Sequence, residues 1–318
     1  MKIIGTGRAN PAKIVTNAML EEFLDTSDEW IRERTGMTER HVISNEKLED
    51  LAAEAARKAI EDAGITPEDI DYIICSNVVN EYITPGLSCI IQGAIGAKCA
   101  CVDVNAACSG FIYALDMADD RIKSGKAKTI LVVAAEEPTR MVDWKDRSIC
   151  VLFGDGAGAA IFRAAEGTGD RSDTGILATK IYADGSQYDH LCSDGGVSLN
   201  QKAGFIHMDG KEVFKVAIPS LVQGVEESLK IAGININEVN WYVPHQANLR
   251  IIDSVAKKLE IDMDKVVVTV DHHGNTSAAS IPLALAESFA AGKFKKGDVI
   301  AISAMGAGFT WGGMVIRI

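Results

Sequence analysis

The strongest constraint on the fold of this chain is a repeat between its two halves. Ala63-Gly64-Ile65 recurs as Ala232-Gly233-Ile234, and the offset of 232 − 63 = 169 residues is about half of the 318-residue chain. Each half continues with a helix, a strand that ends in a turn, a second helix, a loop rich in Lys and Gly, and a further strand. Because strands that alternate with helices form parallel α/β sheets, the repeat predicts two related α/β halves, residues 1–168 and 169–318.

The turn after the apolar run Cys99–Val104 carries the most reactive side chain of the first half. We expect this run to be a buried strand and residues 109–123 to be a helix, because Phe111 and Leu115 belong to one apolar stripe. Cys108 then lies where the helix begins, and the free N–H groups and dipole of a helix start favour a thiolate. The alternative is a small buried apolar cysteine, which describes most free cysteines.

The second half places two polar residues in matching positions. His245 follows the strand that ends at Tyr242-Val243-Pro244, and Asn275 follows an expected strand at Val266–Val270. Chemistry in α/β sheets lies at the carboxyl ends of strands, so Cys108, His245 and Asn275 are expected to share a site. A cysteine nucleophile with two neutral hydrogen-bond donors suits acyl transfer. Taken singly, a structural histidine and a helix-capping asparagine are the alternatives.

The sequence also suggests two other types of site, a metal site and a protease active site. His272 and His273 are adjacent, and adjacent side chains of an extended segment point in opposite directions, so with no third ligand at a usual spacing we expect no metal there. Papain-like proteases also run Cys, His, Asn, and 245 − 108 = 137 falls in their range. Their sequence context around the cysteine is missing here, and they would not account for the repeat.

Composition limits the partners and the compartment. The net charge of −12 argues against nucleic acid or an anionic membrane as the main partner. The longest apolar stretches are too short to span a bilayer, and the first residues lack a secretory pattern. None of the seven cysteines forms a CxxC pair, so a reducing, cytoplasmic setting is expected.

Three motifs carry a resemblance to a known family: Ala106-Ala107-Cys108-Ser109-Gly110-Phe111, Pro244-His245-Gln246-Ala247-Asn248 and Gly274-Asn275-Thr276-Ser277-Ala278. With these three motifs the chain resembles β-ketoacyl-acyl carrier protein synthase III, the initiating condensing enzyme of bacterial type II fatty acid synthesis, within the thiolase superfamily. The resemblance implies a thiolase-like fold, an α/β architecture of duplicated halves layered αβαβα. It also implies a homodimer with the Cys99–Val104 strand at its interface.

The resemblance implies roles for particular residues. Cys108 would take an acyl group from an acyl-CoA primer, and His245 and Asn275 would then stabilise the enolate formed as malonyl-acyl carrier protein loses CO₂. No metal and no cofactor beyond the CoA thioester substrate is implied. The remaining substrate contacts would come from Trp30, Arg34 and Arg147 at the CoA nucleotide, Gly210, Phe214 and Asn248 along the pantetheine, and Gly306 and Ala307 near the oxyanion.

Two further expectations concern specificity and the carrier protein. By resemblance, Thr84 stands where acetyl-primed members carry a Phe that closes the acyl pocket, so we expect primers longer than acetyl, or branched ones, to be accepted. Carrier proteins of the family are acidic, and the helix after Asn248 would turn Arg250, Lys257 and Lys258 outward as a basic patch. The alternatives are a related condensing enzyme with a specialised polyketide or quinolone product, and a scaffold without catalysis.

Overall fold

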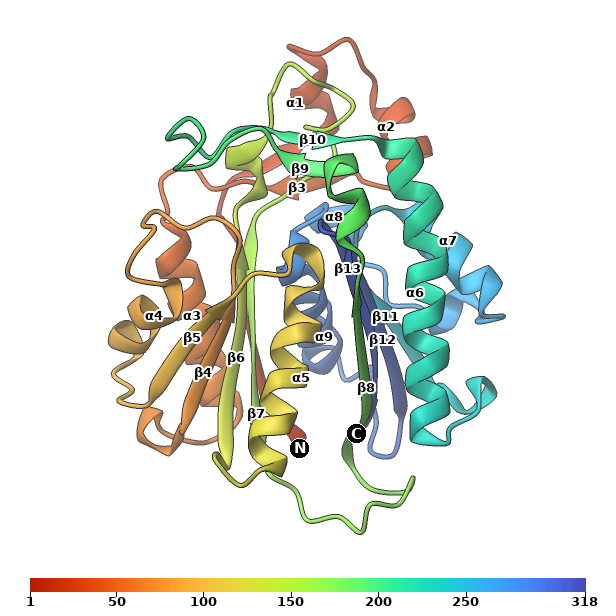
Figure 1. The fold of residues 1–318 in the computed structure, drawn as a ribbon. Coiled ribbons are helices and arrows are strands. Elements are labelled where there is room, and N and C mark those ends of the chain that lie inside the picture. The colour runs from red at the N-terminus through yellow and green to blue at the C-terminus, as the bar shows by residue number, and fades with distance from the viewer.

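The computed structural model describes residues 1–318, which form two large β-sheets with helices between and outside them (Figure 1). Two small sheets, β2 with β3 and β9 with β10, have two strands each. The strands are β1 (Lys2–Ala9), β2 (Ile14–Thr16), β3 (Glu39–His41), β4 (Tyr72–Ser76), β5 (Ala100–Val104), β6 (Thr129–Glu136), β7 (Gly156–Arg163), β8 (Gly175–Ala183), β9 (Leu191–Ser193), β10 (Ile206–Met208), β11 (Trp241–Pro244), β12 (Val299–Gly306) and β13 (Thr310–Arg317). The helices are α1 (Asn17–Glu21), α2 (Asp28–Thr35), α3 (Leu48–Asp62), α4 (Leu87–Ile95), α5 (Gly110–Lys123), α6 (Gly210–Ala232), α7 (Leu249–Lys258), α8 (Val270–His273) and α9 (Ser280–Ala290).

The two large sheets repeat one topology. The first has the strand order β1-β7-β6-β4-β5, and the second has β8-β13-β12-β11. In the first sheet β6, β4 and β5 are parallel, and in the second sheet β12 and β11 are parallel. On the other side of each sheet two strands pair antiparallel: β7 and β1 in the first sheet, and β13 and β8 in the second. The predicted duplicated α/β architecture is confirmed.

The helices and the two large sheets form five layers, which are held together by three hydrophobic cores. One core joins α3 and α4 to the outer face of the first sheet, and another joins α6 and α7 to the outer face of the second. The third core lies between the sheets and contains α5 and α9, which contribute the fully buried Phe111, Leu115 and Leu283. Figure 1 shows α5 and α9 in the centre with a sheet on either side, so the layers follow the order αβαβα. No helix combines the length and the apolar character needed to cross a membrane.

The segment expected as a strand at Val266–Val270 differs from the prediction. Only Val266 makes a bridge, to Tyr242, and Val270 begins the short helix α8. The reason is the buried Gln246, whose amide nitrogen donates to the carbonyl of Val267 and whose oxygen accepts the N–H groups of Thr269 and Val270. One side chain thus satisfies the backbone groups that a neighbouring strand would have paired.

Both central helices are preceded by the same strained turn. The 3-10 helix η2 (Ala107–Ser109) leads into α5, and η7 (Ser277–Ala279) leads into α9. The first residue of each turn has a positive φ, 46° at Ala107 and 53° at Ser277, which is uncommon for residues other than glycine. Such strain persists where the surroundings enforce it, and it often marks functional sites.

The contact between α6 and β13 depends on two glycines. A Cβ added at Gly313 would lie 2.0 Å from the carbonyl oxygen of Gly224. We expect Gly313→Ala to lower the free energy of unfolding by about 1–3 kcal/mol, because overpacking forces the helix away from the sheet. Urea denaturation measures this, with Gly93→Ala as the control, since a Cβ there would meet nothing within 4 Å. Equal midpoints for the two variants would contradict the prediction.

Candidate active site

One cavity of about 500 Å³ opens at the carboxyl ends of the strands, and hydrophobic residues form most of its wall. It brings together most of the residues singled out in the sequence. Those that line it are Trp30, Arg34, Cys108, Gly210, Phe214, His245, Asn248, Arg250, Asn275, Gly306 and Ala307.

Cys108 lies in η2, directly before α5, with its thiol on the cavity wall. The hydroxyl of Ser277 donates to its Sγ over 3.4 Å. Gly306 packs so closely on this turn that a Cβ there would lie 2.6 Å from the Cys108 nitrogen. Burial raises the pKa of the Cys108 thiol to about 11, and the Ser277 hydrogen bond only partly opposes the rise. The expectation of a resting thiolate is therefore wrong, because loss of solvation outweighs the helix start.

His245 enters the cavity from the end of β11. Its backbone N–H donates to the carbonyl of Ser303 over 2.8 Å, which continues the pairing of β11 with β12. The side chain is 4% exposed, and its Nδ1 lies 2.7 Å from the hydroxyl of Ser280. Burial lowers the pKa of His245 to about 4, so the imidazole is neutral at physiological pH.

Asn275 is held by the other half of the chain. Its N–H donates to the carbonyl of Leu152, and its carbonyl accepts the N–H of Gly154. The side-chain oxygen accepts the N–H of Ser277 over 2.9 Å. The Nδ2 group makes no hydrogen bond within the protein and remains a donor at the cavity.

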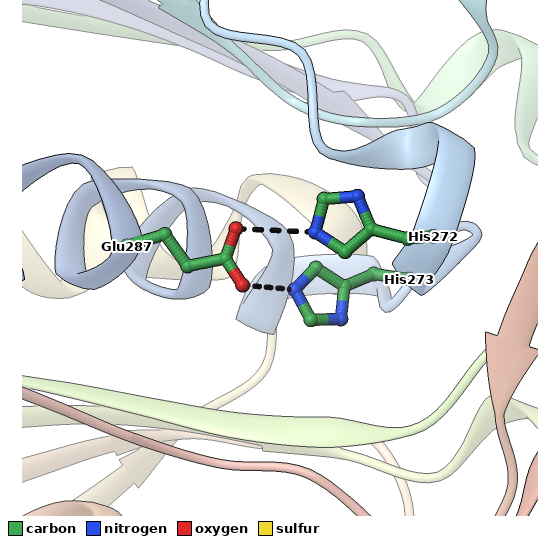
Figure 2. A group of neighbouring side chains, drawn as sticks. All are labelled: His272, His273 and Glu287. Carbon is green, nitrogen blue, oxygen red and sulfur yellow. Dashed lines mark hydrogen bonds and ion pairs between the residues drawn. The ribbon is translucent and has the colours of Figure 1, made fainter. Parts of the chain in front are cut away.

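The two histidines before Asn275 share one carboxylate, as Figure 2 shows. His272 and His273 lie in α8, and their Nε2 atoms are 3.1 and 2.8 Å from the two carboxylate oxygens of Glu287. The expectation that they point in opposite directions and have no third partner is thus wrong, because the segment is helical. These three residues are near enough to one another to hold a metal ion.

The charges around the Glu287 carboxylate already balance without a metal ion. Arg8 donates to Glu287 over 2.7 Å, and Asp271 contacts the second nitrogen of His272 over 2.9 Å. Hydrogen bonds to Asp271 and Glu287 raise the pKa of His272 to about 10, so His272 is a cation. The contacts of His272 and His273 with Glu287 join α8 to α9, and Arg8 of β1 contacts the same carboxylate. A metal ion would have to displace a proton and Arg8.

Trp30 and two arginines gather at the mouth of the cavity. The guanidinium carbons of Arg34 and Arg147 lie 5.0 and 5.2 Å from the centre of the Trp30 ring. Arg147 also pairs with Asp25 over 3.6 Å, and it is not part of the cavity wall. The group offers an aromatic face and two positive charges, the chemistry that a nucleotide with phosphates requires.

Three other predicted residues lie outside the cavity. Thr84 is exposed on the loop before α4. Lys257 and Lys258 are exposed near the end of α7, and Lys257 pairs with Asp253 over 2.6 Å. Arg250, on the first turn of the same helix, is exposed and reaches the cavity mouth.

Sequence reasoning missed Ser277 and Ser280, which contact Cys108 and His245. The repeat contained a signal for Ser277, since 108 + 169 = 277 pairs it with Cys108. Nothing in the local sequence distinguished Ser280 from an ordinary residue near a helix start.

Replacing Ser277 tests the environment of the thiol. Because the Ser277 hydroxyl favours the charged form of Cys108, Ser277→Ala should raise the thiol pKa further. At a fixed pH between 8 and 9 the thiolate fraction falls, and iodoacetamide should alkylate Cys108 roughly two- to tenfold more slowly. Peptide mass spectrometry across pH measures the rate, with the exposed Cys89 as the internal control. An unchanged pH dependence at Cys108 would show that the hydrogen bond has no effect on the thiol.

Comparison with known proteins identifies the family. Residues 102–185 match the model of 3-oxoacyl-[acyl-carrier-protein (ACP)] synthase III, and residues 229–318 match that of its C-terminal part. The chain is 48% identical to the beta-ketoacyl-[acyl-carrier-protein] synthase III of Rhodospirillum centenum, over 99% of this chain and 98% of the relative.

Comparison with solved structures indicates the same family. The 3-oxoacyl-[acyl-carrier-protein] synthase III of Aquifex aeolicus VF5 superposes with a TM-score of 0.94 at 46% identity, covering 100% of this chain and 99% of that one. The priming β-ketosynthase of the R1128 polyketide pathway superposes with a TM-score of 0.93 at 34% identity, covering 100% and 96%. The chain belongs to the β-ketoacyl-acyl carrier protein synthase III family of condensing enzymes, on the thiolase fold.

Proposed function

We propose that this enzyme condenses an acyl-CoA primer with malonyl-acyl carrier protein and so initiates type II fatty acid synthesis. The observation that carries the proposal is the convergence on one cavity of Cys108 from the first half of the chain and of His245 and Asn275 from the second half. All seven cysteines are free, which supports a reducing cytoplasm as the place of action.

In the first step Cys108 accepts the acyl group. The thiol attacks the thioester carbonyl, the new C–S bond forms at Cys108, the bond to CoA breaks, and the cysteine proton leaves with the CoA thiolate as CoA-SH. Since the resting thiol has a pKa of about 11, proton loss accompanies attack. The N–H groups of Cys108 and of the Gly306-Ala307 turn would stabilise the oxyanion.

In the second step the malonyl thioester carbonyl takes hydrogen bonds from His245 and from the Nδ2 group of Asn275. These bonds stabilise the enolate as the C–C bond to the carboxylate breaks and CO₂ leaves. The enolate carbon attacks the acyl-Cys108 carbonyl and expels the cysteine thiolate, which takes up one proton. Both donors are neutral, so neither needs to change its charge during the reaction.

The cavity mouth would hold the CoA nucleotide. Stacking on Trp30 and ion pairs from Arg34 and Arg147 would bind the adenine and the phosphates. Gly210, Phe214 and Asn248 line the same cavity as Trp30 and Cys108, and the pantetheine would lie along them.

A homodimer would complete the enzyme. Strand β5 ends the first sheet, so its outer edge has no partner strand within the chain. Tyr82 and Ile83, on the loop before α4, are 47% and 79% exposed. An open edge and exposed apolar side chains are the features that a second copy would cover.

Separate assays of the two half-reactions test the division of labour. Asn275→Ala removes a donor from the malonyl carbonyl, and decarboxylation should fall roughly 100- to 1,000-fold. Acylation of Cys108 by acyl-CoA should persist within a fewfold, because Asn275 plays no part in that step. Intact-mass detection of the acyl-enzyme and release of CO₂ measure the two reactions. Equal loss of both would refute the division.

Primer length tests the role of Thr84. A second copy would bring its Thr84 over the acyl pocket, where a small side chain leaves room for methylenes worth about 0.8 kcal/mol each. We expect primers longer than acetyl, or branched ones, to be accepted, and Thr84→Phe to narrow the range toward acetyl-CoA. The alternative is that Leu87 or Met208 fills this space; Met208 lines the cavity, and Leu87 is fully buried outside its wall.

The measurement is kcat/KM for acetyl-, butyryl-, isobutyryl- and octanoyl-CoA, with Thr168→Phe at an exposed site as the control. A strict acetyl preference in the unmodified enzyme would rule out the open pocket. A preference for an unusual primer would favour the specialised alternative.

Charge reversal on α7 tests carrier docking. Arg250 has no ion-pair partner and lies at the mouth, so it would attract an acidic carrier protein. Arg250→Glu should raise the KM for malonyl-carrier protein about tenfold and leave acylation by CoA nearly unchanged, and added salt should weaken the docking step. Lys126→Glu, beyond the far end of α5, makes the same charge change as a control. A KM that is independent of salt would remove the support.

A further inference from the structure

The hydroxyl of Ser280 lies directly behind His245. Ser280 is the first residue of α9 and is 2% exposed. Its Oγ lies 2.7 Å from Nδ1 of His245 and accepts the backbone N–H of Gln246 over 3.3 Å. Since His245 is 4% exposed, this contact is closed to solvent.

Counting protons at the contact leaves one arrangement in which every group is satisfied. The hydroxyl has one proton, and Nδ1 of His245 is the one acceptor within its hydrogen-bonding reach. The Ser280 hydroxyl proton can therefore form a hydrogen bond only if Nδ1 of His245 carries no proton. The other tautomer would donate from Nδ1 to the oxygen and leave the buried hydroxyl proton without an acceptor, which folded proteins avoid.

We infer that Ser280 is a positioning residue that holds His245 as its Nε2–H tautomer, so that the imidazole presents a donor to the cavity. The inference rests on the proposed function, in which the malonyl carbonyl needs a donor at that place. Because the pKa of His245 is lowered to about 4, the ring is uncharged and its tautomer alone decides whether it donates or accepts.

The same segment fixes the second donor. The N–H of Ser277 occupies the side-chain oxygen of Asn275, which leaves the Nδ2 group for the substrate. Ser280 thus donates to the acceptor nitrogen of His245, and Ser277 donates to the acceptor oxygen of Asn275. Both His245 and Asn275 are left with N–H groups for the cavity.

Nitrogen NMR of protein labelled with ¹⁵N-histidine reads the tautomer without turnover. His245 is assigned among the six histidines by comparison with His245→Ala. In the unmodified protein Nδ1 should have the shift of a bare nitrogen and Nε2 that of a protonated one. Ser280→Ala should move population to the Nδ1–H form, and Ser280→Thr, which keeps the hydroxyl, should restore the original pattern.

Kinetics give the second readout. CO₂ release from malonyl-carrier protein should fall about tenfold in Ser280→Ala, less than the roughly 100- to 1,000-fold loss expected on removing a donor outright. Acylation by CoA should stay within about twofold of the parent. Ser288→Ala, at another buried serine of α9, should match the parent in both assays.

The outcomes separate this inference from the proposed function. An Nδ1–H tautomer in the unmodified protein, or an unchanged tautomer in Ser280→Ala, would overturn the role of Ser280 even if condensation proceeds. An unmodified protein that neither takes an acyl group nor releases CO₂ would overturn the proposed function, while the NMR result would still decide what Ser280 does to His245.

Discussion

The packing of α5 and α9 in one apolar core between the two sheets is the constraint on which the site depends. Phe111 and Leu115 of α5 and Leu283 of α9 are fully buried in that core, so the starts of both helices are fixed against each other. The turns η2 and η7 lie at those starts, and Ser277 of one turn reaches Cys108 of the other. A duplicated fold thus joins a nucleophile from one half to two donors from the other.

Burial gives these residues their chemistry as well as their place. It keeps Cys108 a thiol, with a pKa of about 11, and His245 a neutral imidazole, with a pKa of about 4. A resting thiol is a weaker nucleophile than a thiolate, and a neutral donor pair suits an enolate that forms and disappears within one cycle. The low polarity that costs the thiolate its solvation also strengthens each hydrogen bond to the oxyanion.

Much of this arrangement could be predicted from the sequence. The 169-residue repeat predicted two α/β halves, and strand ends followed by helices predicted the positions of Cys108 and His245. Asn275 lies in the same cavity, although the segment before it is not the strand that was expected. What escaped prediction depends on side-chain contacts between distant segments. Gln246 replaces a strand partner for residues 267–270, and Glu287 draws two adjacent histidines to one carboxylate. The thiol pKa also depends on a cavity that residues from both halves enclose, which no local pattern reveals.

The account's central claim is that Cys108 carries the acyl group, and intact-mass analysis after incubation with acyl-CoA tests it most directly. The account predicts one added acyl mass per chain, which after digestion is found only on the peptide that contains Cys108. A folded Cys108→Ser variant should gain no acyl mass over the same time. Adding malonyl-carrier protein should then discharge the parent enzyme and release a β-ketoacyl product. An acyl mass that persists in Cys108→Ser at the parental rate, or that maps to another residue, would contradict the claim.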